Sequence, residues 1–253
     1  MDSSRRDFLK GACSVTAGAA ICVATAETAA AAAPMRRGGD ASRRYAMVVD
    51  LRKCIGCQAC TVACSMENQV PLGDFRTIVS QYEVRDADDP TQPAATYTLP
   101  RLCNHCEDPP CVPVCPVQAT YQQKDGKVLV DADRCVGCAY CVQACPYDAR
   151  YINPETQTAD KCTFCTHRTD VGLLPACVET CTGGARVFGD LLDPDSEINA
   201  LLAEHEVKVL RPEQGTSPHV FYIGLDDRFQ GKVDGQAALW VVRDDQGHRI
   251  GEV

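Results

Sequence analysis

The stretch Cys135-Val-Gly-Cys138-Ala-Tyr-Cys141-Val-Gln-Ala-Cys145-Pro146 decides how this chain folds. It has the spacing C-x2-C-x2-C-x3-C-P, which is typical of chains that bind [4Fe–4S] clusters through cysteine thiolates. Three cysteines at intervals of three residues can wrap a tight loop around one cluster, and the fourth begins a segment that points elsewhere. Pro146 stands where the chain leaves this loop, so its missing N–H costs little.

The same plan occurs four times in the chain. Cys54-Ile-Gly-Cys57-Gln-Ala-Cys60-Thr-Val-Ala-Cys64 repeats the run almost letter for letter. Two looser quartets consist of Cys103, Cys106, Cys111 and Cys115, and of Cys162, Cys165, Cys177 and Cys181. Sixteen of the 18 cysteines therefore fall in quartets, which predicts four [4Fe–4S] clusters whose iron is bound by all sixteen. The remaining Cys13 and Cys22 are expected not to be ligands.

In proteins with two clusters, the fourth cysteine of each run binds the neighbouring cluster. Applied to the four quartets, this rule predicts four sets of ligands. They are set 1 (Cys54, Cys57, Cys60, Cys181), set 2 (Cys162, Cys165, Cys177, Cys64), set 3 (Cys103, Cys106, Cys111, Cys145) and set 4 (Cys135, Cys138, Cys141, Cys115). The first quartet is paired with the fourth because these two remain once the second and third quartets are placed in one unit. The alternative, in which Cys54, Cys57, Cys60 and Cys64 share one cluster, stays open.

Zinc and disulfide bonds are the alternatives to iron–sulfur binding. Zinc ribbons use paired CxxC motifs, but not CxxCxxC followed by a fourth cysteine, and not four times over. Disulfide frameworks persist outside the cytoplasm and belong mainly to short chains. The repeated quartets favour iron–sulfur clusters over both.

Composition limits the remaining classes of function. The 253 residues carry a formal charge of −9, with 45% hydrophobic and only 6% aromatic residues. Such a chain is globular, but its ordinary hydrophobic core is thin, so folding is expected to depend on cluster loading. The acidic balance argues against nucleic acid as a partner. After position 30 there is no apolar run of about 18 residues that could span a bilayer.

The first 33 residues have the layout of an export signal. Arg5-Arg6 precedes Phe8-Leu-Lys10, then an apolar stretch covers 11–26, and small residues fill 29–33. Twin arginines specify the Tat route, which exports folded proteins and so permits cluster insertion beforehand. We expect a periplasmic protein. Whether the segment is cleaved or kept as an anchor stays open.

The repeat predicts the fold class. Asp50-Leu-Arg-Lys53 before Cys54 is echoed by Asp131-Ala-Asp-Arg134 before Cys135, so the repeated unit is a strand, a ligand loop and a short helix. We expect an α+β fold of two tandem ferredoxin-like dicluster modules, one from the inner and one from the outer pair of quartets. Inserted β-strands and a C-terminal extension complete it.

The expected segments follow from these units. They are the Tat signal (1–33), a linker (34–44), the first [4Fe–4S] unit (45–75), an insertion (76–93), the second unit (94–125), the third unit (126–155), the fourth quartet (156–190) and the C-terminal extension (191–253). Strands are expected at 45–50, 76–84, 96–99, 207–210 and 219–223, a hairpin turn at Asp125-Gly126, and a helix capped by Ser196. Trp240 is either a docking residue or simply packed.

Some residues beside the ligands could tune the clusters. Four cations precede the first cysteines of the quartets, and these are Lys53, Arg101, Arg134 and Lys161. A nearby cation favours the more negative, reduced state of a cluster, although solvated loop charges would do little. His105 and His167 are expected to form hydrogen bonds or pack, because cysteines already fill the ligand positions. No residue set suggests a catalytic site.

Longer motifs carry a resemblance to a known family. These motifs are Pro100-Arg-Leu-Cys103-Asn-His-Cys106, Cys111-Val-Pro-Val-Cys115-Pro-Val-Gln-Ala-Thr120, Cys141-Val-Gln-Ala-Cys145-Pro-Tyr-Asp-Ala-Arg150 and Ala159-Asp-Lys-Cys162-Thr-Phe-Cys165. Over roughly residues 45–190 the chain resembles the iron–sulfur subunits of the dimethyl-sulfoxide reductase superfamily. The start Met1-Asp-Ser-Ser-Arg-Arg6 and the stretch Gly215-Thr-Ser-Pro-His-Val-Phe-Tyr222 make it most similar to the tetrathionate-reducing branch.

The resemblance implies a subunit that relays electrons. Its partners would be a quinol-oxidising integral membrane subunit and a molybdopterin-containing catalytic subunit, in a complex peripherally attached to the inner membrane. All sixteen quartet cysteines match the family's ligand positions. Polysulfide, thiosulfate or nitrite as terminal acceptor, and a free-standing soluble ferredoxin-type carrier, are the alternatives. A docking role for the C-terminal extension is expected as well.

Overall fold

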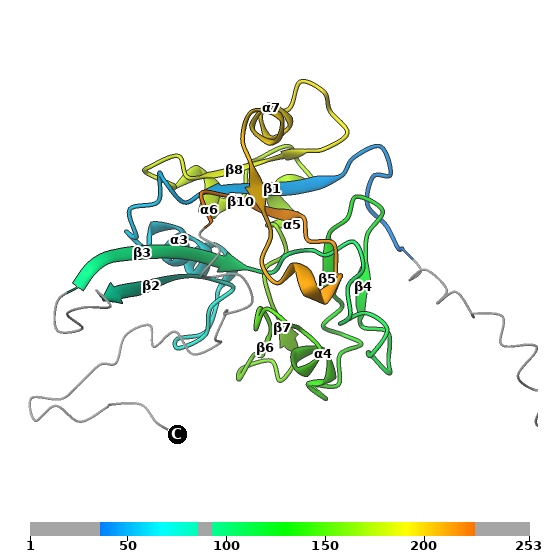
Figure 1. Ribbon diagram of the computed structural model, residues 1–253. Helices are drawn as coiled ribbons and strands as arrows, with labels where there is room; N and C mark the ends of the chain where they lie inside the picture. The colour runs from blue at the N-terminus through cyan, green and yellow to red at the C-terminus, as the bar shows by residue number, and fades with distance from the viewer. Residues whose placement is uncertain (1–35, 86–92, 226–253) are drawn as a thin grey trace, which may run out of the picture. The chain divides into compact units, whose positions relative to one another are not determined.

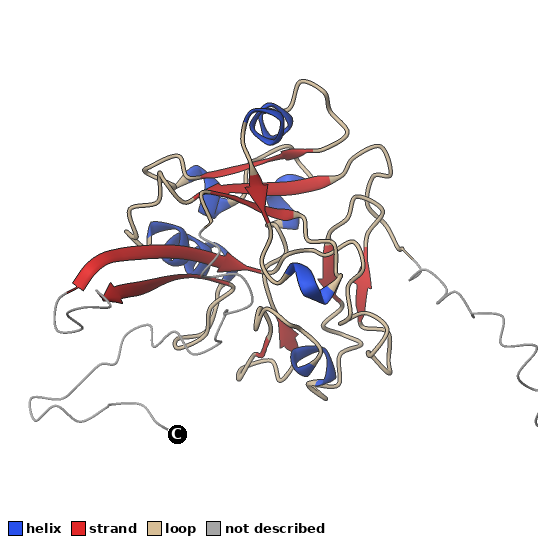
Figure 2. Ribbon diagram, in the orientation of Figure 1, coloured by secondary structure: helices blue, strands red, loops and turns tan. Residues whose placement is uncertain are grey.

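The computed structural model describes residues 36–85 and 93–225, whose short helices and strands form an α+β fold (Figure 1, Figure 2). The expected signal segment with Cys13 and Cys22, residues 86–92 and the tail containing Trp240 lie outside the described residues. Within the described part, no helix is both long enough and apolar enough to cross a membrane.

A four-stranded sheet is built on β1 (Tyr45–Asp50). Its order is β8-β1-β10-β9, where β8 is Arg186–Asp190, β10 is Val220–Ile223 and β9 is Val207–Lys208. β1 runs antiparallel to β8 and parallel to β10. The sheet therefore joins the strand before the first quartet to the strand after the fourth and to the C-terminal extension.

All six residues of β1 are buried because both faces of this strand are covered. Successive side chains of a strand point to opposite faces. Ala46 and Val48 pack with Ile198 of α7 (Glu197–Glu204), and Met47 lies on the opposite face in a core that contains several quartet cysteines. Figure 1 shows α7 on one side of the sheet, with α3 on the other. Burying one side chain such as Ile198 contributes about 2 kcal/mol.

Three two-stranded sheets surround this cysteine-rich core. They are β2 (Thr77–Arg85) with β3 (Pro93–Leu102), β4 (Thr120–Gln122) with β5 (Val128–Val130), and β6 (Tyr151–Ile152) with β7 (Ala159–Asp160). The predicted hairpin at Asp125-Gly126 is confirmed as the turn between β4 and β5, where Gly126 has φ 90°. The strands expected at 76–84 and 96–99 are confirmed as β2 and β3.

The remaining helices are short, and all but a 3₁₀ turn contain or directly follow quartet cysteines in the sequence. They are α3 (Ala59–Asn68), α4 (Tyr140–Gln143), α5 (Thr166–Thr169), α6 (Ala176–Glu179) and a 3₁₀ turn at Pro212–Gln214. Helices of four residues bury little surface by themselves. The position of α4 and α6 therefore depends on what Cys141 and Cys177 contact.

The prediction that Ser196 caps a helix is only partly correct. Ser196 does stand directly before α7, but its hydroxyl makes no capping hydrogen bond. Instead Ser196 Oγ accepts the backbone N–H of Asp190 at 3.2 Å, at the end of β8. The Ser196 hydroxyl that could have capped α7 is thus used to hold the tight connection from β8 to α7.

Candidate iron–sulfur sites

The ligand loops share a left-handed turn just before their second cysteine. Gly56 and Gly137 have φ 71° and 66°, and the equivalent positions of the other two loops are His105 and Phe164, with φ 44° and 53°. A Cβ on Gly137 would lie 2.4 Å from the carbonyl oxygen of Gln157. Glycine is therefore required at that position both for the backbone angle and for the space.

In three of the four quartets, the fourth cysteine is followed by a turn of its own, and this turn is alike in all three. A left-handed residue follows three positions later, namely Gln118, Asp148 and Gly184. The next N–H then points back at the sulfur, and Ala119 donates to Cys115 Sγ at 3.1 Å and Ala185 to Cys181 Sγ at 3.3 Å. Cys64 differs, because α3 continues past it to Asn68.

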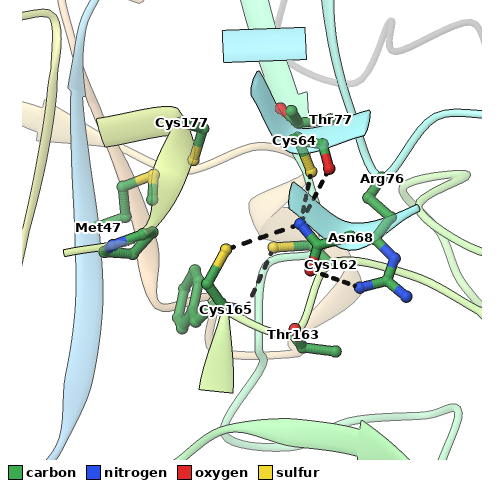
Figure 3. A pocket seen from close by; sticks show the side chains of 11 residues that line it. Met47, Cys64, Asn68, Arg76, Thr77, Cys162, Thr163, Cys165 and Cys177 are labelled. Atoms are coloured by element: carbon green, nitrogen blue, oxygen red, sulfur yellow. Dashed lines mark hydrogen bonds between the residues drawn. The ribbon is translucent and has the colours of Figure 1, made fainter. Parts of the chain in front are cut away.

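The four cysteines of set 2 line one cavity, although they come from two quartets far apart in sequence. Cys64 comes from α3, Cys162 and Cys165 from the loop before α5, and Cys177 from α6. All four are buried, and Figure 3 shows their sulfurs pointing toward one another. α3 and α6 contact each other beside this cavity.

The side chain of Asn68 closes the set 2 cavity. Its amide Nδ2 lies 3.6 Å from Cys64 Sγ and 3.8 Å from Cys165 Sγ, and it donates to the carbonyl oxygen of Cys64 at 3.0 Å (Figure 3). Arg76 Nη1 donates to Asn68 Oδ1 at 2.9 Å, and Arg76 is itself paired with Asp160 at 2.9 Å. This chain of contacts fixes which end of the amide faces the sulfurs.

Set 1 lines a second cavity. Cys54, Cys57, Cys60 and Cys181 all border it, together with Arg186. Cys57 is exposed, and its sulfur lies 3.4 Å from the hydroxyl of Thr182. Here too a fourth cysteine from a remote quartet joins the first three.

The cysteines of set 3 are close enough to act on one another electrostatically. Burial and the neighbouring sulfur of Cys103 raise the pKa of Cys106 to about 12, and Cys111 and Cys145 add to the effect. Burial likewise raises the pKa of Cys111 to about 11, with the sulfurs of Cys103 and Cys145 acting in the same direction. Cys103 and Cys106 are also buried in one apolar core cluster, and Cys145 packs against it.

The members of set 4 differ in their surroundings. Cys141 is buried with Val128 in one apolar cluster, and Cys135 packs against that cluster. Cys138 is exposed, and Cys115 lies in the turn that leads into β4. All sixteen quartet cysteines are free thiols, so the disulfide alternative is wrong for the described residues. In the same part of the chain, no three His, Cys, Asp or Glu side chains could hold a single metal ion.

The chemistry of these cavities fits a [4Fe–4S] cluster. Burial, followed by the nearby sulfurs of Cys177 and Cys165, raises the pKa of Cys64 to about 12. Four thiolates can share such a cavity only if positive charge compensates them, and the iron of a cluster supplies that charge. The cavities therefore suit a metal cluster better than four bare thiolates.

Besides Arg101, three buried cations have no carboxylate partner among the described residues, and these three lie beside the cysteine sets. They are Arg150, Lys161 and Arg186, with relative exposures of 5%, 1% and 3%. Lys127, by contrast, is buried but paired with Asp125 and Asp170. An unpaired buried charge is costly, so an anion is expected next to each of the three. A cluster with four thiolate ligands is such an anion.

Two of the four cations predicted to tune the clusters are buried, and two are not. Lys161 and Arg101 are buried, whereas Lys53 and Arg134 are exposed. Burial lowers the pKa of Lys161, and the sulfurs of Cys103 and Cys162 act in the opposite direction. Lys53 and Arg134 are exposed, as expected under the alternative in which these cations are solvated loop charges that do little to the clusters.

The sequence reasoning missed Arg150 and Arg186. Both lie five residues after a fourth cysteine, in the repeated pattern Cys-x3-Ala-Arg that begins at Cys145 and at Cys181. Burial by itself would lower the pKa of Arg186, but the sulfurs of Cys177 and Cys60 outweigh it and the pKa is raised. This shared pattern could have identified both arginines from the sequence alone.

The two histidines beside ligands form hydrogen bonds, as predicted. The ring of His105 is fully buried, and its Nδ1 accepts the backbone N–H of Val128 at 3.0 Å. His167 is exposed, and its Nε2 lies 2.8 Å from Glu67. Neither lines the set 1 or set 2 cavity.

The α+β fold and its cysteine sites define an iron–sulfur protein that binds [4Fe–4S] clusters and transfers electrons. Residues 94–191 match a family model described as a 4Fe-4S dicluster domain. The chain is 61% identical over 244 residues to the B subunit of tetrathionate reductase from Salmonella typhimurium, with 95% of this chain and 96% of that protein covered. It is 45% identical to the B subunit of tetrathionate reductase from Archaeoglobus fulgidus, over 72% of this chain and 83% of the relative.

A further relative is the B polypeptide of polysulfide reductase from Wolinella succinogenes, which is 44% identical over 72% of this chain and 95% of its own length. The chain therefore belongs to the family of reductase iron–sulfur subunits that includes the B subunit of tetrathionate reductase. Its role is that of an electron-transfer subunit.

Proposed function

We propose that this chain relays electrons through four [4Fe–4S] clusters from a quinol-oxidising membrane subunit to a molybdopterin-containing catalytic subunit that reduces tetrathionate to thiosulfate. When bound, each cluster would accept and release one electron at a time. The residues of the chain hold the four sites close together, exclude water from the inner ones and place charge between them.

The observation that carries this proposal is the mixed origin of the two cysteine-lined cavities. The set 1 cavity takes Cys181 from the fourth quartet, and the set 2 cavity takes Cys64 from the first. This exchange supports ligand sharing between neighbouring clusters. Sets 3 and 4 are assigned on the same plan, with three cysteines from one quartet and the fourth from its neighbour, which supports two tandem dicluster modules.

Exposure and charge support the order in which the sites are used. Of the sixteen cysteines, Cys57 in set 1 and Cys138 in set 4 are exposed, and those of set 2 are all buried. Arg186 interacts electrostatically with cysteines of sets 1 and 2. Lys161 does so with sets 2 and 3, and Arg150 with sets 3 and 4. We therefore propose the order 1-2-3-4, with electrons entering and leaving at the two ends.

Cluster number and ligand exchange can be tested together. The wild-type protein should contain about sixteen irons, four in each of four clusters. Cys64→Ser should change the same EPR signal as Cys177→Ser, and Cys181→Ser the same signal as Cys57→Ser. If Cys64→Ser instead alters the signal that Cys57→Ser alters, the exchange is wrong.

Tetrathionate as the acceptor is supported by the two relatives named above that are tetrathionate reductase B subunits. The test is quinol oxidation by the purified complex with tetrathionate, polysulfide, thiosulfate or nitrite as the only acceptor. Turnover with tetrathionate alone is expected. Turnover with one of the others instead would reassign the complex, and isolation as a free monomer that serves unrelated partners would favour a soluble carrier.

Export to the periplasm is supported by Arg5-Arg6 and the apolar stretch behind it. A double change of Arg5 and Arg6 to lysine should retain the protein in the cytoplasm, as measured by fractionation. The adjacent pair Arg36-Arg37, changed in the same way, is the matched control and should leave export intact. Equal export of both variants would contradict the Tat route.

A further inference from the structure

We propose that Arg186, Lys161 and Arg150 each serve two neighbouring cluster sites at once, so that one buried charge sets the potentials of two clusters together. The inference rests on the proposed four-cluster function and adds the residues that couple the sites. Each junction in the order 1-2-3-4 then contains one cation.

Arg186 stands between sets 1 and 2. It borders the set 1 cavity with Cys60, and its charge acts against the effect of burial on the pKa of Cys177 of set 2. Nη2 donates to Thr77 Oγ1 at 2.8 Å, and Thr77 borders the set 2 cavity. Nη1 has no partner among the described residues, so part of the guanidinium is free to face an anion.

Lys161 stands between sets 2 and 3. It directly precedes Cys162, and its Nζ donates to the carbonyl oxygens of Cys162, at 2.6 Å, and of Val128. Val128 in turn donates its N–H to the ring of His105, which lies in the ligand loop of set 3. The ammonium group is therefore held on one side by Cys162 of set 2. On the other side it is held by Val128, which contacts the ligand loop of set 3 through His105.

Arg150 stands between sets 3 and 4. Nη2 donates to Cys111 Sγ at 3.0 Å, and Nη1 to Thr120 Oγ1 at 3.3 Å. Cys111 of set 3 and Cys141 of set 4 pack in one buried cluster, and both sulfurs act on the charge of Arg150. Its Nε lacks a partner among the described residues.

A shared cation has a specific consequence for electron transfer. Adding an electron makes a cluster more negative, which opposes reduction of its neighbour because charges interact strongly in a buried, low-dielectric region. A cation between the two stabilises both reduced states and so raises both potentials. A cation near only one cluster would raise the reduction potential of that cluster alone.

The test is an EPR-monitored redox titration of the full chain in its complex, with each signal assigned through the cysteine variants above. Arg186→Gln should lower the potentials of sites 1 and 2, Lys161→Gln those of sites 2 and 3, and Arg150→Gln those of sites 3 and 4. Arg134→Ala removes an exposed cation that precedes a ligand in sequence, and should leave all four potentials near the wild-type values.

Iron content separates the possible failures. A wild-type protein with far fewer than about sixteen irons overturns the proposed function itself. Full iron content with only one potential lowered, or none, in Arg186→Gln and Arg150→Gln overturns the shared-cation proposal. If a glutamine variant loses iron, Arg186→Lys and Arg150→Lys keep the charge and should lower the same two potentials by less. A change at one site alone would again overturn it.

Discussion

The imidazole of His105 stacks on the phenyl ring of Phe164, with ring centroids 3.7 Å apart and planes 18° apart. The two residues hold the same position in the ligand loops of set 3 and set 2, and both have positive φ. Phe164 also meets Phe188 of β8 edge-on at 5.2 Å, and Phe188 stacks on Tyr45 of β1 at 5.2 Å. One line of rings therefore ties two ligand loops to the central sheet.

Phe164→Ala should destabilise the protein by about 3–5 kcal/mol, because it removes a 1% exposed ring and leaves a cavity between the two loops. Thermal unfolding of the iron-loaded protein measures the loss. Phe75→Ala is the control, since Phe75 is 38% exposed and its loss should cost much less. Equal losses for the two variants would show that the ring stack is not structural.

The sequence alone predicted the local features of this fold. The β4–β5 hairpin and the strand β1 each follow from neighbouring residues, such as Asp125-Gly126 between two apolar runs. Sets 1 and 2 were predicted from the rule for two-cluster proteins, with the first and fourth quartets paired by subtraction. Local geometry was enough for the hairpin and the strand.

Contacts between distant segments could not be predicted in this way. Nothing in the residues of β1 indicates that β10, from the C-terminal extension, lies parallel beside it. Likewise, the Cys-x3-Ala-Arg pattern marks Arg186, but only the pairing of β8 with β1 shows that its side chain reaches Thr77 beside the set 2 cavity. Such neighbours depend on the packing of the whole chain.

Gly137→Ala should destabilise the set 4 loop far more than Gly172→Ala. Both glycines have positive φ, so each alanine has a backbone cost of about 1–2 kcal/mol. Only at Gly137 does the new Cβ meet a backbone oxygen, 2.4 Å away, which adds about 1–3 kcal/mol. Iron content and thermal unfolding measure the difference, and equal behaviour would mean that the loop can move away from Gln157.

Removal of iron should unfold the body of the protein. Cysteines make up much of the core around Met47 and Phe164, and the short helices α4, α5 and α6 each have only four residues. Without iron, buried thiols replace the groups that hold these segments together. A chelator should therefore abolish the far-UV circular dichroism signal, with a thiol reductant alone as the control. Retention of cooperative unfolding without iron would contradict this.

Asn68→Ala should lower the potential of site 2 alone. The amide N–H groups lie 3.6 Å from Cys64 Sγ and 3.8 Å from Cys165 Sγ, and hydrogen bonds to the sulfurs favour the reduced cluster. A weak hydrogen bond contributes about 0.5–1 kcal/mol, which corresponds to about 20–40 mV for one electron. Asn199→Ala is the control, because that amide binds only backbone carbonyls near α7. A redox titration that moves sites 1 and 2 together in Asn68→Ala would instead assign the effect to a general rearrangement of the α3–α6 contact.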